Sequence, residues 1–314
     1  MTTLREHLAE YLATRRALGY QLVDVGRLLS QFCDWLEQET SDWFTSKQVA
    51  CWVHLPEGTG PQWRSKRLGA VRGFARYLAA MGTPVEVPGT QIAPRHTGRP
   101  TPYLFTQTSL DALGEALTDT CPHGLPKATT CTLVGLLAVT GLRVGEAIAL
   151  DENDIDLQAG VLTIRAAKGD FDRFVPLHQS TVTQLADYLH SEQRQHRLRE
   201  VGGPVFITNR GTRIGYKTVH SRFRTATQAA KLHGAPGQPN PTLHHLRHSF
   251  AVNVLIDAYR HCDDPARTMD LLATWLGHAN PRATYWYMSA SPELLALAAQ
   301  RLQHHESLTG EVTP

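Results

Sequence analysis

The sequence contains few cysteines and no pattern that would pair them. Five cysteines are scattered along 314 residues. An odd, scattered set is typical of a reducing compartment and not of a disulfide framework. No apolar run reaches the roughly 20 residues that span a bilayer. The first residues, MTTLREHLAEYLATRR, also lack the apolar core of a secretory signal. We therefore expect a cytoplasmic protein with no membrane segment.

Net charge is also small, at +2, so the bulk charge does not indicate a nucleic-acid-binding protein. The basic residues are nevertheless segregated into residues 61–75, which carry no acid, and residues 194–231, which carry a single acid, Glu200. Such segregation can build a basic face on a nearly neutral protein, although two solvated helix faces would look the same. The residues that we predict to contact DNA are Arg64, Lys66, Arg67, Arg72, Arg222 and Arg224. When bound to DNA, the protein would associate with the bacterial nucleoid.

The spacing of apolar residues divides the chain into regions of different structure. Leu4, Leu8, Tyr11 and Leu12 form one helical stripe, and similar stripes recur up to residue 78. Residues 83–103 are rich in proline and have no periodicity, which predicts a linker. Residues 161–177 read as a β-hairpin among helices, and a helix is expected from about Pro292. We predict a mainly α fold with a small β-hairpin: a helical domain over residues 1–82, the linker, and a mixed α/β domain with a C-terminal tail helix over residues 104–314.

Four short segments hold side chains suited to chemistry on a phosphate. Arginine forks match phosphate oxygens and can stabilise the charge that develops on them. A tyrosine oxygen is a nucleophile once its proton, with an ordinary pKa of about 10, has left. A lysine or histidine can return a proton to the leaving oxygen. Together these groups perform phosphoryl transfer without a metal ion or cofactor. The candidates are Arg143, Lys168, His244, Arg247, His278, Tyr285 and Tyr287.

Each of these residues has an ordinary structural interpretation when it is considered alone. An arginine at a helix start commonly pairs with an acid one turn later, as Arg143 could with Glu146, and tyrosines commonly pack. The order of the motifs is more specific. TGLRVGEAIAL, then the lysine of AAKGD, then LHHLRHSFAVNVL and WLGHANPRATYWY resemble the tyrosine recombinase (phage integrase) family over residues 105–302. The helical first domain and the linker suit that family's core-binding domain.

The resemblance implies a role for each matching residue. In the family the nucleophile lies nine positions after the histidine of the Gly-His motif, which selects Tyr287 over Tyr285. His248 matches a frequent family residue with a structural role. The other implied roles are phosphate binding by Arg143 and Arg247, general acid catalysis by Lys168, proton handling by His244, a hydrogen bond to the phosphate from His278, and orientation of the site by Glu146.

The resemblance also implies the reaction and its partners. Tyr287 would attack a scissile phosphate, giving a 3′-phosphotyrosyl link and a free 5′-hydroxyl, on double-stranded recombination sites. Strand exchange implies a homo-tetramer on DNA, or an assembly with sister recombinases. The outcome would be integration, excision or transposition of a mobile element, or dimer resolution. An interval between Arg247 and His278 that is longer than usual, with the excess near residues 261–265, is similar to transposon-type recombinases.

Three other functions stay open from the residues alone. A type IB topoisomerase uses similar chemistry, and a catalytically silent DNA-binding regulator could share the fold. A metal nuclease would need converging carboxylates, for which the acids of residues 151–156 are candidates. Cys121, His123 and Cys131 do not form a convincing zinc pattern. We expect no metal.

Overall fold

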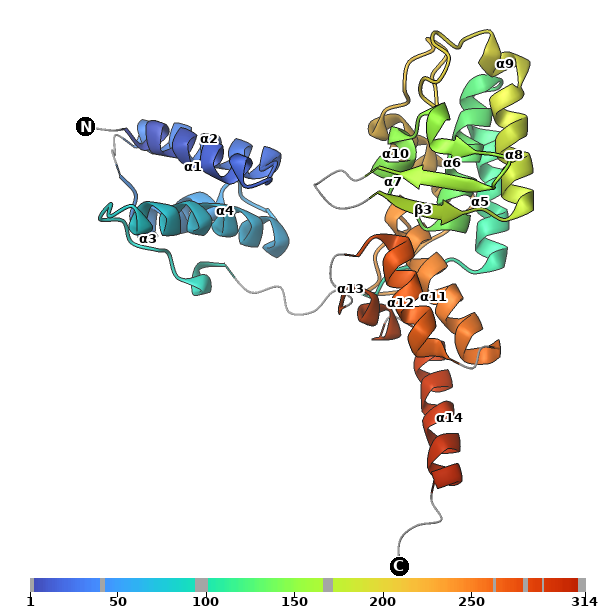
Figure 1. The fold of residues 1–314 in the computed structure, drawn as a ribbon. Helices are drawn as coiled ribbons and strands as arrows, with labels where there is room; N and C mark the ends of the chain where they lie inside the picture. Colours follow the sequence, from blue (N-terminus) through green and yellow to red (C-terminus); the bar gives the residue numbers. More distant parts are fainter. Residues whose placement is uncertain are drawn as a thin grey trace, which may run out of the picture. The chain divides into compact units, whose positions relative to one another are not determined.

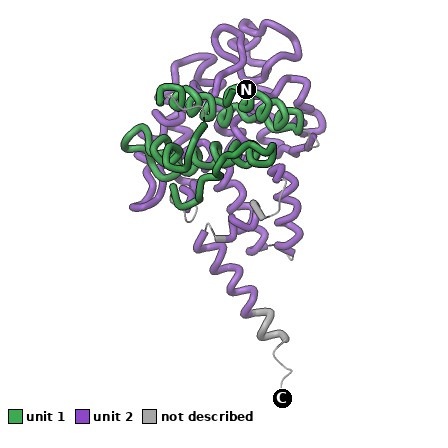
Figure 2. The backbone as a smooth tube through the Cα atoms, turned by 90° about the vertical axis from the view of Figure 1, so that its left-hand side faces the viewer, with its two compact units in different colours: residues 1–99 green, residues 100–314 purple. Residues whose placement is uncertain are grey.

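The computed structural model describes residues 3–39, 43–93, 101–165, 172–261, 264–278, 282–289 and 291–309 (Figure 1). The chain forms two compact units, Met1–Arg99 and Pro100–Pro314 (Figure 2). The boundary between them lies inside the segment that we predict as the linker. None of the helices in the described ranges is both long and apolar enough to cross a membrane.

The first unit is helical. Its elements are α1 (Leu4–Ala17), α2 (Val23–Gln38), α3 (Ser46–His54), α4 (Pro61–Ala80) and the short 3-10 helix η1 (Thr90–Ile92). Thr3 and Thr45 begin α1 and α3 with capping boxes, in which each side-chain oxygen accepts a backbone N–H of the first turn. Phe32, Trp52 and Phe74 are buried between the helices. Part of the predicted linker also packs on this core, since Ala93 is only 3% exposed.

The second unit is a mixed domain with a small antiparallel sheet in the order β1-β2-β3. Leu162 pairs with Val175, so the predicted hairpin is present in its two described strands. The mainly α fold with a small sheet is thus confirmed. The elements are α5 (Gln107–Thr120), α6 (Leu125–Thr140), α7 (Val144–Ala149), η2 (Glu152–Asp154), β1 (Ile155–Asp156), β2 (Val161–Ile164), β3 (Arg173–Pro176), α8 (Gln179–His190), α9 (Glu192–Gln195), α10 (Tyr216–Ala229), α11 (Leu243–His261), α12 (Pro265–Leu276), α13 (Arg282–Tyr285), η3 (Trp286–Ser289) and α14 (Pro292–Thr309).

Two apolar clusters fill the second unit. The larger one joins the sheet to α5, α6, α8 and α10, and the smaller one joins α11, α12, η3 and the start of α14. Helix α11 packs against α6 and so connects the two clusters. Helix α6 ends at Gly141, whose φ is +63°, and a Cβ there would come within 2.5 Å of the Phe250 ring on α11. Glycine therefore permits both the left-handed turn and the close approach of α11.

The acids of residues 151–156 bind arginines and backbone amides. Asp151 pairs with Arg213, Asp154 with Arg165 at 2.6 Å, and Glu152 with Arg194 at 2.6 Å. The side chain of Asp156 accepts from the amides of residues 158 and 159. Among the described residues no three His, Cys, Asp or Glu side chains gather as metal ligands. These carboxylates therefore stabilise the junction between α7, β1 and the loop after α9.

Arg194 is the buried centre of this junction, and its removal should destabilise the second unit. Its side chain is fully buried and also donates to the carbonyls of Val205 and Pro204. Arg194→Met would leave the carboxylate of Glu152 without its arginine partner. We expect the free energy of unfolding to fall by about 3 kcal/mol, measured by urea denaturation. Arg224→Met, at an exposed position of α10, is the matched control. Equal stability of the two variants would contradict the prediction.

Candidate active site

The two arginines of the predicted phosphate site lie on either side of one backbone turn. Arg247 is buried on α11 and donates to the carbonyls of Gly141, at 2.9 Å, and Leu276, at 2.7 Å. Arg143 precedes α7 and donates to the carbonyl of Gly277 at 3.2 Å. Both guanidinium groups are thus held at the carboxyl-terminal end of α12, and that of Arg247 also at the end of α6, where carbonyl groups lack helical partners.

Burial works against the charge of Arg247. Burial first, and then the nearby charge of Arg143, lower the pKa of Arg247 from its ordinary value to about 10. A hydrogen bond with Tyr287 and the charge of Glu146 act in the opposite direction. Arg247 therefore stays protonated at neutral pH, and the site holds two positive charges close together.

Glu146 balances these charges from the first turn of α7. One carboxylate oxygen accepts from Arg143 Nη1 at 2.8 Å. The other accepts from the Arg143 backbone N–H at 2.9 Å and from Arg173 Nη2 at 2.7 Å. Burial would raise the pKa of Glu146, but the bonds to Arg173 and Arg143 hold it below its ordinary value. The carboxylate is therefore ionised and fixes the orientation of Arg143.

His278 follows the left-handed residue Gly277 at the end of α12. Its Nε2 lies 3.1 Å from Nη2 of Arg247, and its Nδ1 lies 2.7 Å from the Thr284 hydroxyl. Burial, followed by the charges of Arg247, Arg143 and Arg173, lowers the pKa of His278 to about 4. Since an arginine can only donate, Nε2 accepts and the neutral ring carries its proton on Nδ1.

The structure distinguishes clearly between the two tyrosines. Tyr287, in η3, is 2% exposed, and its ring stacks on His278 with centroids 6.2 Å apart and planes 18° apart. It also hydrogen-bonds Arg247. Tyr285, on α13, is 59% exposed. Tyr287 therefore lies among the candidate residues, whereas Tyr285 points its ring to solvent.

The remaining candidates occupy different positions. His244 is exposed on α11, and its ring lies 4.5 Å from that of His248, which in turn lies 5.5 Å from Tyr287. Lys168 lies outside the described residues, between β2 and β3. Nothing in the structure tests the chemical role of these residues, so their roles stay predictions.

Several of the basic residues that we predict to contact DNA form contacts within the protein, and one of them is buried. Arg67 is 6% exposed, with its guanidinium 3.6 Å from the centre of the Trp52 ring. Lys66 pairs with Asp24 at 2.7 Å, and Arg72 donates to the carbonyl of Pro88. In the second unit, Arg222 donates to the Pro126 carbonyl and the Thr130 hydroxyl, while Arg224 is exposed. Whether any of them contacts DNA stays a prediction.

Two site residues escaped the sequence analysis. Thr284 is fully buried and contacts His278, and Arg173, on β3, contacts Glu146. For Arg173, the alternation of residues along the strand could have indicated a role in the site. It lies two positions before the buried Val175, so the alternation of the strand turns it towards the interior. A charged side chain on that face needs a charged partner.

Comparisons with known proteins agree with this geometry. The sequence model of the phage integrase family matches residues 111–293. A putative integrase/recombinase, y4rB, of Sinorhizobium fredii is 37% identical over 308 residues, which are 96% of this chain and 98% of the relative. Tyrosine recombinase XerD of Pseudomonas aeruginosa is 30% identical over 237 residues, 74% of this chain and 72% of the relative. The Tn1549 transposon integrase in complex with transposon right end DNA has a similar fold, with a TM-score of 0.70 at 13% identity, over 96% of this chain and 99% of that one.

The fold and these relatives define a tyrosine recombinase. The chain belongs to the phage integrase family and is a site-specific DNA recombinase, an enzyme that transfers DNA strands. The resemblance inferred from the motifs is thus confirmed. The comparisons favour neither the topoisomerase nor the silent regulator.

The protonation state of His278 gives a direct test of the site's electrostatics. We expect its ring to titrate at about pH 4 and to be neutral at pH 7. Because the folded form binds this proton less tightly than the unfolded chain, protonation of His278 favours unfolding as the pH falls below 6.5. NMR titration of the ring proton, assigned with His278→Asn, measures the pKa. In Arg247→Met the pKa should rise, and an ordinary pKa in the unaltered protein would contradict the arrangement.

Proposed function

We propose that Tyr287 is the nucleophile of this recombinase. Its oxygen forms a bond to the scissile phosphorus while the bond from phosphorus to the 5′-oxygen breaks, giving a 3′-phosphotyrosyl link. The 5′-hydroxyl of a partner strand reverses the step, so that the energy of the phosphodiester is kept. The observation that carries the proposal is the position of Tyr287, which hydrogen-bonds Arg247 and stacks on His278.

The charges around Tyr287 suit this reaction. The buried cation of Arg247 favours the ionised form of a tyrosine bonded to it, and buried charges act more strongly than exposed ones. Arg143 has five N–H groups, of which two donate to Glu146 and Gly277 within the described residues. Its remaining donors can bind phosphate oxygens on the half-exposed side of the site. Two arginines would thereby perform the charge stabilisation that other phosphoryl transferases obtain from metal ions.

The leaving 5′-oxygen needs a proton, and Lys168 is the donor that we propose. Strands β2 and β3 bring the two ends of its loop to the site, since Arg173 at the start of β3 binds Glu146. The exposed His244, which lies on the same α11 face as Arg247, is the second candidate for proton handling. No cofactor enters either step.

We propose that the enzyme acts in the cytoplasm on double-stranded DNA sites, as a tetramer of this chain or with sister recombinases. Solved neighbours of similar fold include XerH bound to palindromic difH substrate and the Tn1549 integrase bound to transposon DNA. The long interval before His278 and the extensive match to the putative integrase/recombinase y4rB favour a mobile element as the source of these sites.

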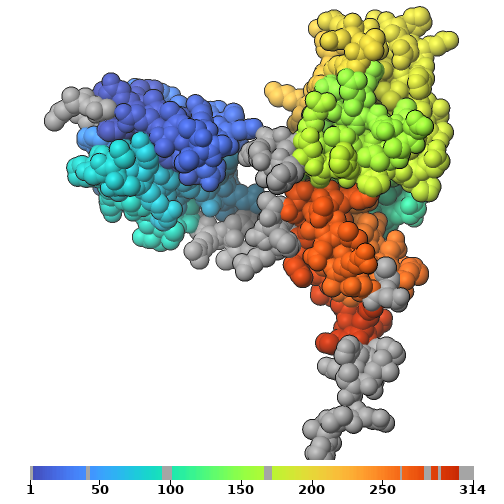
Figure 3. Space-filling model, viewed as in Figure 1, coloured from blue at the N-terminus to red at the C-terminus, as the bar shows by residue number. Residues whose placement is uncertain are grey.

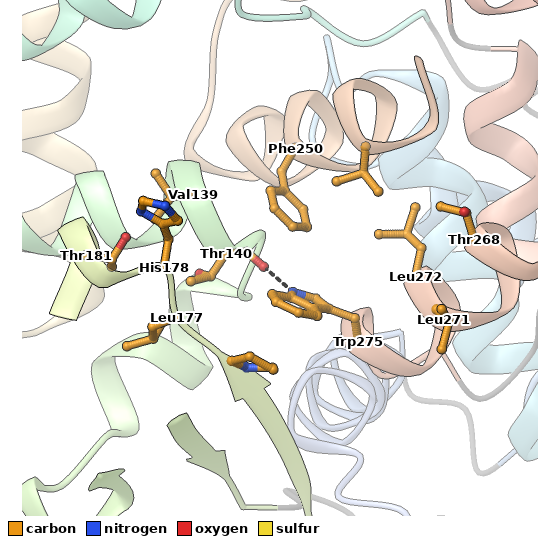
Figure 4. Close-up of a pocket in the computed structure, with 12 residues that line it drawn as sticks. Val139, Thr140, Leu177, His178, Thr181, Phe250, Thr268, Leu271, Leu272 and Trp275 are labelled. Carbon is orange, nitrogen blue, oxygen red and sulfur yellow. Dashed lines mark hydrogen bonds between the residues drawn. The ribbon is translucent and has the colours of Figure 1, made fainter. Parts of the chain in front are cut away.

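The second unit carries two apolar surfaces that suit assembly. The first is a groove of about 430 Å³ near α11 and α12, with Val139 and Leu271 exposed at its edge (Figure 4). Phe250 and Trp275 form its floor, and Trp275 Nε1 donates to the Thr140 carbonyl at 2.8 Å.

The second apolar surface lies on α14. Leu294, in its first turn, is buried in the same unit, while Leu295 is 50% exposed and Leu302 is 62% exposed. Helix α14 extends away from the rest of the second unit (Figure 3). We propose that the outer part of α14 occupies this groove on a neighbouring protomer, repeated cyclically around the tetramer.

Covalent trapping tests the nucleophile. On a nicked suicide substrate, Tyr287→Phe should abolish the covalent protein–DNA adduct, because it removes only the attacking oxygen. Tyr285→Phe is the matched control and should keep the adduct, which is measured as a shifted band on a denaturing gel. The reverse pattern would move the nucleophile two residues towards the N-terminus.

Charge substitutions test the assembly without disturbing the fold. Leu302→Asp and Leu271→Asp place a charge on the two proposed contact surfaces, so each should weaken the four-protomer complex about tenfold or more. Binding to a single DNA site should change little. Val201→Asp, at a residue that is 92% exposed and outside the groove, is the control. Analytical ultracentrifugation on one-site and two-site DNA measures both complexes, and unaltered assembly of both variants would exclude this contact.

A further inference from the structure

Arg173 joins three parts of the site that lie far apart in the sequence. It begins β3, and its side chain is 16% exposed. Its Nη2 donates to Glu146 at 2.7 Å, in the first turn of α7. Its Nε donates to the carbonyl of Trp275 at 2.8 Å, in the last turn of α12. One guanidinium group therefore connects the catalytic hairpin to the segments that carry Arg143 and His278.

The turn before His278 is built around this guanidinium. Gly277 has a φ of +65°, and a Cβ at this position would lie 2.9 Å from Arg173 Nη1. Two features therefore favour glycine at position 277: the left-handed backbone and the space that Arg173 fills. A shift of Arg173 would release the turn that holds the imidazole of His278 beside Arg247.

We propose that Arg173 is a positioning residue for strand cleavage. It holds Glu146 against Arg143 and fixes the turn from Trp275 to Gly277, so that Arg143 and His278 are placed before the phosphate arrives. The inference rests on the proposed function, because it assigns a partner to residues of that site. Arg173 acts through these residues and not on the reacting atoms.

The geometry argues against direct binding of the phosphate by Arg173. Two of its nitrogens already donate to Glu146 and Trp275, and the third, Nη1, lies next to Gly277. An arginine suits this position because its planar fork reaches a carboxylate and a carbonyl at once. A lysine could keep only one of the two contacts.

The charge of Arg173 also affects the titration of its neighbours. Glu146 faces Arg143 and Arg173, with Arg247 and His278 close by. Without Arg173, burial would raise the pKa of Glu146, and the pKa of His278 would rise as well because one nearby cation is lost. Both changes protonate the site at a higher pH. Loss of Arg173 should therefore move the acid side of the cleavage pH profile upward.

The test compares Arg173→Met and Arg173→Lys with the unaltered protein. Single-turnover formation of the Tyr287 adduct on a nicked substrate is measured between about pH 4 and pH 8, so that the range reaches the acid inflection expected from the low pKa of His278. We expect Arg173→Met to be about 10- to 100-fold slower at neutral pH, with its acid inflection at higher pH. Arg173→Lys keeps the charge and one of the two contacts, so it should recover part of the rate, with an inflection near that of the unaltered protein. If Arg173→Met does not fold, Arg173→Gln, which also removes the charge, carries the test through the same shift of the inflection.

Two further comparisons separate positioning from other roles. In a Glu146→Gln background, Arg173→Met should cost less than it does alone, because the two residues act as one unit. In a substrate with sulfur at the 5′-bridging position, the sulfur leaves without needing a proton. This substrate should therefore restore cleavage by Lys168→Ala but not by Arg173→Met. Fully additive losses, an unmoved pH profile or rescue by the sulfur substrate would each overturn the inference.

The outcome also distinguishes this inference from the proposed function. If the unaltered protein forms no Tyr287-dependent adduct, the proposed function fails. If the unaltered protein forms the adduct and Arg173→Met forms it at the same rate, only the role of Arg173 fails.

Discussion

The second unit depends on the hydrogen bonds of one buried guanidinium. Arg247 donates to the carbonyl of Gly141 at the end of α6 and to that of Leu276 at the end of α12. Those carbonyls have no helical partners, and a buried arginine without acceptors would be costly. Because Arg247 donates to both carbonyls, it holds the ends of α6 and α12 against α11. The segments that carry Arg143 and His278 begin directly after these ends, so the same contact positions both of them.

Concentrated positive charge is the second constraint on the site. Arg143, Arg173 and Arg247 lie close together, and Glu146 is the carboxylate that binds two of them. The balance leaves the site cationic and His278 neutral. A cationic site favours both a phosphate and an ionised tyrosine. Bringing these arginines together is electrostatically unfavourable, but the resulting positive charge is in place before the substrate binds.

Charge segregation along the sequence proved a poor guide to the surface. Arg194 and Arg213 belong to the basic run of residues 194–231, yet they pair with Glu152 and Asp151. Arg67 belongs to the other run and stacks on Trp52. Acids and bases that are separate in sequence meet in space, because burial of an arginine is tolerated only with acceptors around it.

The sequence by itself determined the class of fold, the family and the candidate catalytic residues. Helical periodicity and the hairpin pattern predicted the mainly α fold, and the order of the Arg, HxxR, Gly-His and Tyr motifs predicted a tyrosine recombinase. Only the tertiary structure decided what surrounds those residues. Arg173 binds Glu146 and Trp275, which lie 27 and 102 positions away, and the hydroxyl of Thr284 contacts the ring of His278. Local patterns report which residues share one face of one element. Contacts between distant elements depend on how helix ends and strands pack, and this packing places Tyr287 beside Arg247 while Tyr285, two residues earlier, stays exposed.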